Sequence, residues 1–473
     1  MKIPRQKLQF LIILLLTIIF TISCKKDRLN PLDPKNPNSN VGILPPPDVT
    51  VSLDFRTVIL SWDLIPNAVA YRVFRDDENI VTVDTNCFEN KTVEVNKQYK
   101  YQVNSVHESG LGGHLSTPVY VVPKDLIWEF NDAGNSYSSP AIGDNGDVYV
   151  CANGYLYALS QNGKEQWNYY IDDYIGVTPV ISDDNTTIYI LNKDYLYALS
   201  AGGSLKWKQE LSCSYRRYLS IANDGMIYIP LYDTLVALNT DGTLIWKCTL
   251  PGIYSKSTSI GAEGTIYVNP GSDSRIYALN PDGTTKWLSN PSELSSIISN
   301  AFAIDDEEIL YFISWLDYTS PALISVDGNN GNVRWTFNLG SGSYINEEPN
   351  VIIGPNGTIY TTSSYGLCAI TNSGTLKWKV RYGAYVYGTP VVGQNSTIYV
   401  TGRGYLYAIN SDSTLDWSYH GLKGEERNQP PVIANEKIYI QTSIELYAIQ
   451  AYGELVNASW PCFQHDAKHS GRK

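Results

Sequence analysis

The sequence predicts an all-β chain in which a β-sandwich precedes an eight-bladed β-propeller. Three observations support this expectation. A motif of about 40 residues recurs eight times, helical periodicity of useful length is absent, and Asp-Gly or Asn-Gly turns separate short β-branched and aromatic segments. The chain has 473 residues, which is enough for more than one domain.

Each repeat is expected to form four short strands. A small apolar segment comes first, a β-branched segment with a central Tyr second, a segment of the type "LYAL" third and a Trp-bearing segment fourth, as in "GYLYALSQNGKEQW" (154–167) for the last two. Four strands per repeat of this length are typical of a propeller blade. The central tyrosines are Tyr149, Tyr189, Tyr228, Tyr267, Tyr311, Tyr360, Tyr399 and Tyr439.

The eighth repeat indicates how the ring closes. It has Asn457 where the other repeats have Trp, and the missing strand occurs before the first repeat, as "DLIWEF" (125–130). We therefore expect this N-terminal strand to pair into the last blade, which removes two free sheet edges. The propeller is predicted to span residues 125–458, and residues 459–473 form a C-terminal tail.

The segment 46–123 resembles a fibronectin type III domain. The resemblance depends on "LSW" with Trp62, "AYRVFR" with Tyr71, and "YKYQV" with Tyr99 and Tyr101. It implies that Trp62 lies in the sandwich core and that one of the two later tyrosines is the corner tyrosine of such domains. Domains of this class act as spacers or protein-contact units.

The first residues predict export and a lipid anchor. Residues 1–23 have a basic head and an apolar run at 8–20, which is short for a membrane span and typical of a signal peptide. "TISC" resembles the lipobox of bacterial lipoproteins, which implies acylation of Cys24. Lys25 follows it, and by the same resemblance favours the outer membrane. Residues 24–45 are expected to be a disordered tether. The alternative is an uncleaved anchor.

Charge and cysteine spacing exclude several classes of function. The net charge is −12 and no Lys/Arg stripe occurs, so we do not expect a nucleic acid partner. The six cysteines after Cys24 show no metal-like spacing. A disulfide is compatible with export, but the sequence does not assign a pair.

The repeat "LYAL…DG…W" and the tail "SWPCFQHDAKHSGRK" (459–473) resemble the PQQ-like, quinoprotein-type propeller family over about 125–473. The resemblance implies that the repeated tryptophans pack between blades. They are Trp167, Trp207, Trp246, Trp287, Trp335, Trp378 and Trp417. Quinone-dependent members have an adjacent Cys-Cys pair and a calcium site with a catalytic Asp. Neither pattern occurs here, so we predict no cofactor, no metal and no enzymatic activity.

Two short motifs leave a metal site as an alternative. "DGNNGN" (327–332) has the composition of a calcium loop, but its place in the repeat favours a turn. His465 and His469 are four residues apart, so they would share one face if the tail were helical. Packing of the tail is the competing interpretation.

The connections between blades are the predicted binding face. They are rich in Tyr and carry Arg and Glu, whereas Trp315 lies in a long insertion outside the repeat register. Such side chains form an amphipathic recognition surface, unless the tyrosines only pack at the loop bases. The candidates are Trp315, Tyr318, Tyr174, Tyr215, Arg216, Arg217, Tyr254, Tyr344, Glu348, Tyr385 and Tyr387.

These features together predict a non-enzymatic scaffold lipoprotein at the outer membrane, on its periplasmic or cell-surface side. Its loop face is expected to contact an envelope protein or a glycan, and the chain is expected to be monomeric. The propeller resembles the lipoprotein of outer-membrane barrel assembly, which implies a role in that process. The alternative is an enzyme, either a quinone-dependent dehydrogenase or a polysaccharide-active protein.

Overall fold

The computed structural model describes residues 44–471 with internal gaps. The residues outside this description are 1–43, 55–56, 95–96, 123–125, 135–137, 172–177, 212–217, 232, 251–256, 269–274, 290–296, 300, 317–319, 341–349, 364–365, 383–385, 387, 425–429, 452–454, 456–461, 463–464, 467–468 and 472–473. The chain divides into two compact units, Met1–Lys124 and Asp125–Lys473. Each unit is described by itself.

Unit 1 is a sandwich of two antiparallel sheets, with strand orders β1-β2-β5 and β4-β3-β6-β7. Side chains alternate between the core and solvent along its strands, as in β2. Its strands are β1 (Val49–Asp54), β2 (Thr57–Trp62), β3 (Ala68–Arg75), β4 (Glu78–Val83), β5 (Cys87–Asn90), β6 (Tyr99–His107) and β7 (Val119–Val121).

The core of unit 1 contains the aromatic residues that the sequence places there. Trp62 is buried, and its ring centroid lies 5.3 Å from that of Tyr71. Tyr99 is also buried, and its hydroxyl accepts a 2.7 Å hydrogen bond from the backbone N–H of Glu94. A tyrosine that bonds backbone a few residues upstream is the contact expected of a corner tyrosine. The fibronectin type III assignment itself stays a prediction.

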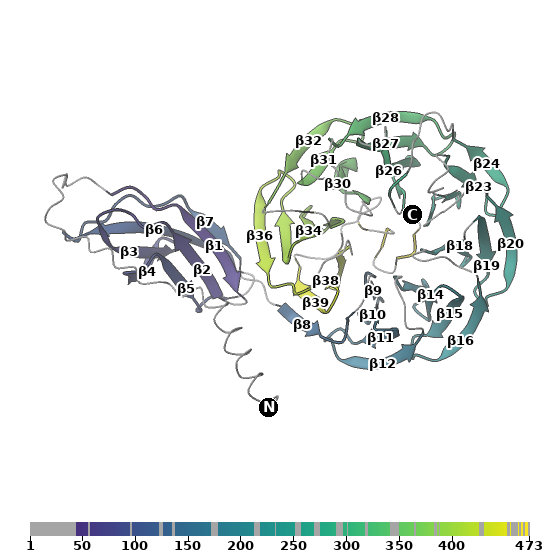
Figure 1. Cartoon of the computed structure of the whole chain (residues 1–473), viewed down its shortest axis with the longest axis horizontal. Coiled ribbons are helices and arrows are strands. Elements are labelled where there is room, and N and C mark those ends of the chain that lie inside the picture. The colour runs from purple at the N-terminus through teal and green to yellow at the C-terminus, as the bar shows by residue number, and fades with distance from the viewer. Residues whose placement is uncertain are drawn as a thin grey trace, which may run out of the picture. The chain divides into compact units, whose positions relative to one another are not determined.

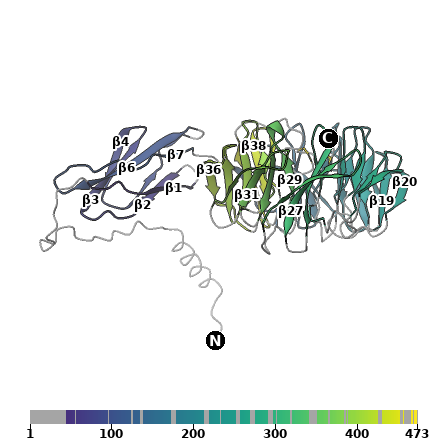
Figure 2. The same ribbon diagram turned by 90° about the horizontal axis from the view of Figure 1, so that it is seen from above.

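Unit 2 is a ring of four-stranded antiparallel sheets, of which the described residues form eight (Figure 1). We number these sheets as blades in chain order. The second and third strands of each blade are buried on both faces, whereas the fourth is on the circumference and partly exposed. Figure 2 shows the same ring from its edge.

The first four blades follow the predicted order of strands along the chain. Blade 1 consists of β9 (Ala141–Ile142), β10 (Val148–Ala152), β11 (Tyr155–Leu159) and β12 (Glu165–Tyr170). Blade 2 consists of β13 (Val180–Ile181), β14 (Thr187–Leu191), β15 (Tyr195–Ser200) and β16 (Leu205–Glu210). Blade 3 consists of β17 (Ser220–Ile221), β18 (Ile227–Pro230), β19 (Thr234–Leu238) and β20 (Leu244–Thr249). Blade 4 consists of β21 (Thr258–Ile260), β22 (Ile266–Val268), β23 (Tyr277–Leu279) and β24 (Thr285–Leu288).

The remaining blades repeat the pattern, with a 3₁₀ turn, η1 (Pro355–Gly357), in blade 6. Blade 5 consists of β25 (Ala303–Ile304), β26 (Ile309–Trp315), β27 (Pro321–Asp327) and β28 (Val333–Asn338). Blade 6 consists of β29 (Val351–Ile353), β30 (Ile359–Ser363), β31 (Gly366–Ile370) and β32 (Leu376–Val380). Blade 7 consists of β33 (Val391–Val392), β34 (Ile398–Gly402), β35 (Tyr405–Ile409) and β36 (Leu415–His420).

The predicted closure of the ring is confirmed in blade 8. This blade consists of β37 (Val432–Ala434), β38 (Lys437–Gln441), β39 (Leu446–Gln450) and β8 (Leu126–Phe130). β8 pairs antiparallel with β39, and Trp128 stands opposite Ala448. In every blade the central Tyr packs against the Trp of the same blade, with ring centroids 5.8–6.0 Å apart. Trp128 therefore takes the place of the Trp that the eighth repeat lacks.

Buried polar side chains join neighbouring first strands near the centre of the ring. Ser139 Oγ in blade 1 donates to the carbonyl of Pro430 in blade 8 at 3.1 Å. Ser220 Oγ in blade 3 donates to the carbonyl of Thr258 in blade 4 at 2.7 Å. Because such bonds are shielded from water, they help fix each blade relative to the next.

Cysteine states and helix content complete the description. Cys87 at the start of β5 is disulfide-bonded. Cys151, Cys248, Cys368 and Cys462 are free, whereas the other two cysteines lie outside the described residues. Within the described ranges, no helix is long and apolar enough to cross a membrane.

Candidate functional site

Most of the predicted binding face lies outside the described residues. This holds for the lipidation candidate Cys24 and for all but one of the loop residues. Those loop residues are Tyr174, Tyr215, Arg216, Arg217, Tyr254, Tyr318, Tyr344, Glu348, Tyr385 and Tyr387. Their role stays a prediction.

Trp315 is the described member of the predicted set. It ends β26 and pairs with Pro321 at the start of β27, so it lies at the tip of the blade 5 hairpin. Its side chain is half-buried. The neighbouring Leu316 is 40% exposed and its N–H donates to the carbonyl of Ser320 at 2.9 Å. The hairpin therefore presents apolar surface beside Trp315.

The repeated tryptophans pack between blades, as the resemblance implied. Seven of the indole N–H groups donate to a backbone carbonyl in the turn of the next blade, as Trp167 does to Ala201 at 2.9 Å. Trp128, Trp207, Trp246, Trp287, Trp335 and Trp378 make the equivalent bond at 2.8–2.9 Å. Trp417 is buried at 3% exposure in the cluster that joins blades 7 and 8. These tryptophans are therefore structural and do not form a ligand cage.

The motif "DGNNGN" (327–332) is explained by hydrogen bonds within a turn. Asp327 Oδ1 accepts a 2.8 Å hydrogen bond from the N–H of Asn329, and the Asp327 carbonyl accepts another from Gly331 at 2.8 Å. An Asp side chain that bonds backbone two residues on is an ordinary turn device. No group of His, Cys, Asp or Glu with the arrangement of a metal site occurs in the described part of the chain.

The two tail histidines do not share a helical face. His465 and His469 have φ values of 73° and 59°, which lie in the left-handed region and do not belong to a right-handed helix. The ring of His469 is buried, and its Nε2 donates to the carbonyl of Pro140 in blade 1 at 3.0 Å. Packing therefore explains His469.

The tail contacts first strands on several sides of the ring, and its yellow segments lie toward the middle of Figure 1. The carbonyl of Ser470 accepts a 2.9 Å bond from Ile221 in blade 3, and that of Gly471 accepts one of 2.9 Å from Ile260 in blade 4. Leu455, which precedes the tail, forms a β-bridge with Gly393 beside blade 7. The tail thus accepts hydrogen bonds from backbone N–H groups of first strands that would otherwise face the central axis.

The described residues also contain an aromatic cluster that the sequence interpretation missed. It lies where each third strand begins and each fourth strand ends, on the same face as the connections between blades. We call it the aromatic arc because the tyrosines at the start of its third strands occur in blades 7, 1 and 2, with blade 8 between blades 7 and 1. Its members are Tyr155, Tyr157, Tyr170, Tyr195, Tyr197, Tyr405, Tyr407 and His420.

Ring contacts within the arc are close. Tyr155 stands opposite Tyr170 in the sheet, and their rings meet edge to face at 5.2 Å. Tyr405 stands opposite His420, and these rings are stacked at 4.3 Å. In blade 2, Lys208 Nζ lies 4.6 Å from the ring centroid of Tyr195. Each outward tyrosine is therefore held against a residue of the fourth strand.

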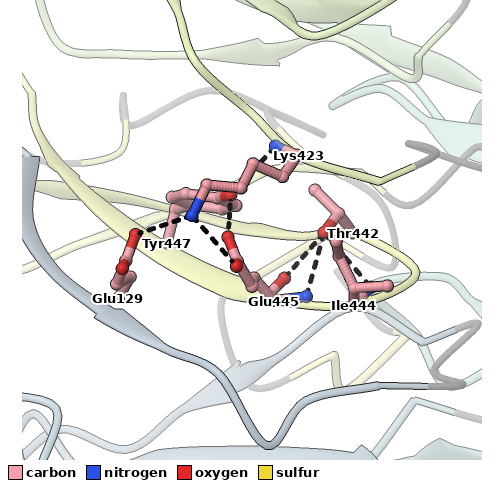
Figure 3. Close-up of polar contacts among 6 residues, drawn as sticks. All are labelled: Glu129, Lys423, Thr442, Ile444, Glu445 and Tyr447. Atoms are coloured by element: carbon pink, nitrogen blue, oxygen red, sulfur yellow. Dashed lines mark hydrogen bonds and ion pairs between the residues drawn. The ribbon is translucent and has the colours of Figure 1, made fainter. Parts of the chain in front are cut away.

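Blade 8 has a polar cluster at the equivalent place (Figure 3). Glu445 occupies the position of the outward tyrosines, and its carboxylate accepts a hydrogen bond from the hydroxyl of Tyr447. Lys423 Nζ lies 3.2 Å from Glu445 Oε1 and 4.0 Å from Glu129 Oε2. The backbone N–H of Lys423 donates a hydrogen bond to the Tyr447 hydroxyl at 2.9 Å. The cluster joins β8, β39 and the end of blade 7.

Electrostatics in this cluster follow from burial. Tyr447 is 1% exposed, and burial together with the adjacent Glu445 carboxylate raises the pKa of its hydroxyl well above the ordinary value. The hydroxyl therefore stays protonated and remains a hydrogen-bond donor at neutral pH. This arrangement suits a structural junction and not a general acid or base.

The fold and these sites define a β-propeller built from PQQ-like repeats. A family model described as outer membrane protein assembly factor BamB matches residues 192–351 and 321–458, which together span more than half of the chain. The chain belongs to this family. No curated protein sequence matches it significantly.

Solved structures show the same fold. BamB from Moraxella catarrhalis has a TM-score of 0.55 and 17% identity, and the match covers 69% of this chain and 99% of that one. The C-terminal WD40 domain of Sif2 has a TM-score of 0.53 and 15% identity, covering 70% and 99%. The computationally designed Ika8 protein has a TM-score of 0.53 and 10% identity, covering 68% and 97%.

Proposed function

We propose that this protein is a lipid-anchored, non-enzymatic scaffold of the outer membrane that binds a protein partner during outer-membrane protein assembly. The observation that carries the proposal is the match to the assembly-factor family over residues 192–458. The signal peptide and "TISC" agree with it, because acylation of Cys24 would place the propeller at a membrane surface.

The internal contacts of the ring support a scaffold. The residues that recur in every blade, the central Tyr and the Trp, are engaged in packing and hydrogen bonds between blades. The side chains that recur in every blade thus make the ring rigid. The specificity of binding then depends on positions that vary between blades. A rigid platform loses little conformational entropy when it binds, which favours association.

The tail bears on the quinone-dependent alternative. His469, Ser470 and Gly471 bond blades 1, 3 and 4 from the inside of the ring. A ligand near the axis would compete with these contacts. We expect no turnover of alcohols when quinone, calcium and an electron acceptor are added, and no turnover on a panel of glycans.

The proposal is tested by affinity purification from cells that make the full chain. Envelopes are solubilised in mild detergent, the tagged protein is captured, and co-purifying proteins are identified by mass spectrometry against a capture from untagged cells. The proposal predicts stoichiometric recovery of a protein of the outer-membrane barrel-assembly machinery. Recovery of no assembly protein, together with turnover in the enzyme assays, would overturn it.

A further inference from the structure

We infer that the partner protein docks on the aromatic arc, across blades 7, 8, 1 and 2, and not on the blade 5 hairpin that carries Trp315. This inference rests on the proposed function, because it takes the partner to be a protein. It adds to that function the place on the propeller where the partner binds and the side chains that contact it.

One position in the repeat differs between the two sides of the ring. The outward residue at the start of the third strand is Tyr405 in blade 7, Glu445 in blade 8, Tyr155 in blade 1 and Tyr195 in blade 2. The other four blades have Thr234, Arg275, Ala322 and Gly366 there. Thr and Ala are accepted at this position, so folding does not require Tyr. The three tyrosines lie in neighbouring blades, and in blade 8 between them Glu445 is buried beneath the exposed Lys423 side chain.

Further aromatic side chains pack against the arc and hold it in place. Tyr157 packs edge-on against Phe130 of blade 8 with centroids 5.2 Å apart. Tyr407 stacks on Tyr382 of the blade 6 exit at 6.2 Å. Both lie two residues after an outward tyrosine and hold it in place. Side chains fixed before binding cost less entropy when a partner arrives, which is typical of interface hot spots.

The contacts that the tyrosine rings already make indicate the class of partner. Stacking of a sugar needs an open ring face, whereas Tyr405 already stacks on His420 and Tyr195 already has Lys208 over its ring. These two tyrosines therefore present their ring edges and hydroxyl groups to a partner. Tyr170, which is 51% exposed, extends this surface. Aromatic edges with polar handles suit a protein surface, where Tyr is enriched at interface cores.

The cations at the rim of the arc have neighbours of opposite charge within the chain. Lys423 is paired with Glu445, and Lys208 lies in the same strand as Glu210. Lys423 also lies 4.0 Å from Glu129, so these cations have carboxylates of the same chain beside them, and we do not expect cation pairing with the partner to drive the contact. We therefore expect the affinity to change less than about threefold between 50 and 200 mM salt, because steering by unbalanced charge is what salt screens.

The test uses photo-crosslinking in cells, with probes at exposed ends of fourth strands. A photoreactive phenylalanine analogue replaces Tyr170 in blade 1 or, as a control, Leu288 in blade 4. Both residues end a fourth strand, and they are 51% and 45% exposed. A third probe replaces Trp315. The inference predicts an adduct with a barrel-assembly protein from position 170 and none from position 288 or 315.

Binding of the identified partner, as purified protein, is then measured for the full chain and for variants. The variant Tyr155→Thr/Tyr195→Thr/Tyr405→Thr copies the residue that blade 3 already has. The control variant is Leu288→Thr/Asn338→Thr on the other side of the ring. We expect the Kd to rise at least about tenfold for the triple variant and less than twofold for the control. Thermal unfolding of each variant shows that the ring is intact.

The outcomes separate this inference from the proposed function. Adducts from position 315 or 288 alone would overturn the arc and leave the scaffold in place. Adducts from no position, with no assembly protein in the affinity capture, would overturn both. Binding of a glycan that the triple variant loses would overturn the choice of a protein partner. If the triple variant unfolds, the adduct from position 170 still decides the location.

Discussion

The indole ring of Trp167 lies directly over Gly203 of the next blade, so that a Cβ atom on this glycine would come within 2.6 Å of ring carbon Cδ2. Gly203 has a φ of 84°, a conformation that glycine adopts without strain. Five further pairs repeat this contact. They are Trp128–Gly163, Trp207–Gly242, Trp246–Gly283, Trp287–Gly331 and Trp335–Gly374. The repeated Trp and the Gly of the turn therefore form one contact unit that joins blades.

Replacing this glycine should destabilise the ring. We expect Gly203→Ala to lower the free energy of unfolding by about 2–4 kcal/mol, because it combines overpacking against Trp167 with an unfavourable φ. The measurement is the urea unfolding midpoint, followed by tryptophan fluorescence.

The neighbouring glycine is the matched control. A Cβ atom on Gly202 would meet only Ser200 Oγ, at 3.9 Å. Gly202→Ala should change the free energy of unfolding by less than about 0.5 kcal/mol. Equal effects of the two substitutions would contradict the role assigned to the Trp–Gly contact.

The polar cluster of blade 8 should hold the closing strand in place. Glu445→Ala leaves the buried Tyr447 hydroxyl without its acceptor, and we expect a loss of about 1–3 kcal/mol. In this variant, amide hydrogen exchange should accelerate more in β8 and β39 than in the strands of the other blades. Lys193→Ala, which removes an exposed pair with Asp194, is the control and should cost less than about 1 kcal/mol. Exchange that is unchanged in β8 would count against this role.

The tail should make stability depend on pH in acid. Burial raises the pKa of Asp466, but hydrogen bonds and charge from His465, together with hydrogen bonds from Ser470, outweigh it and lower the pKa to about 2. An unperturbed Asp titrates near about 3.9. The Asp466 carboxylate therefore stabilises the fold above about pH 4, and this contribution is lost as the pH falls from about 4 to 2.

Asp466→Asn removes that titration. The difference in melting temperature between the native chain and Asp466→Asn should shrink as the pH falls below about 4. A difference that stays the same down to pH 2.5 would show that Asp466 is not the responsible group.

Cys24 should carry the lipid anchor. Mass spectrometry of the mature N-terminal peptide should find acyl groups on Cys24, and Cys24→Ser should release the protein from the membrane fraction. An unmodified Cys24 thiol, or a peptide that links Cys24 to Cys87 through a disulfide, would contradict acylation of this residue.

The blades of unit 2 were predictable from the sequence because the residues that mark their strands and turns are close together in the chain and recur in each repeat. The central Tyr and the Trp stand at the same place in each repeat, so their packing role followed from repetition. Asn457 in place of Trp revealed that another segment must complete the last blade, and Trp128 was the available substitute. Gly203 was predictable as a turn residue, but its contact with Trp167 required the geometry between blades.

The aromatic arc was missed for an equally specific reason. Tyr155 and Tyr405 occur inside the repeat motif, where repetition predicts a role in folding and not a role at the surface. The change from Tyr to Thr234 or Ala322 at this position was the available clue. The contacts of His469 and Ser470 with blades 1 and 3 were not predictable, since only the closed ring brings these segments together.

The measurement that tests the central claim most directly is the amount of folded outer-membrane β-barrel protein in cells that lack this chain. Folded and unfolded barrels are separated by their different mobility before and after heating. The account predicts that deletion lowers the folded fraction, that the native gene restores it, and that neither Cys24→Ser nor the triple tyrosine variant restores it fully. A folded fraction that is unchanged by deletion would contradict the claim that this protein serves outer-membrane assembly.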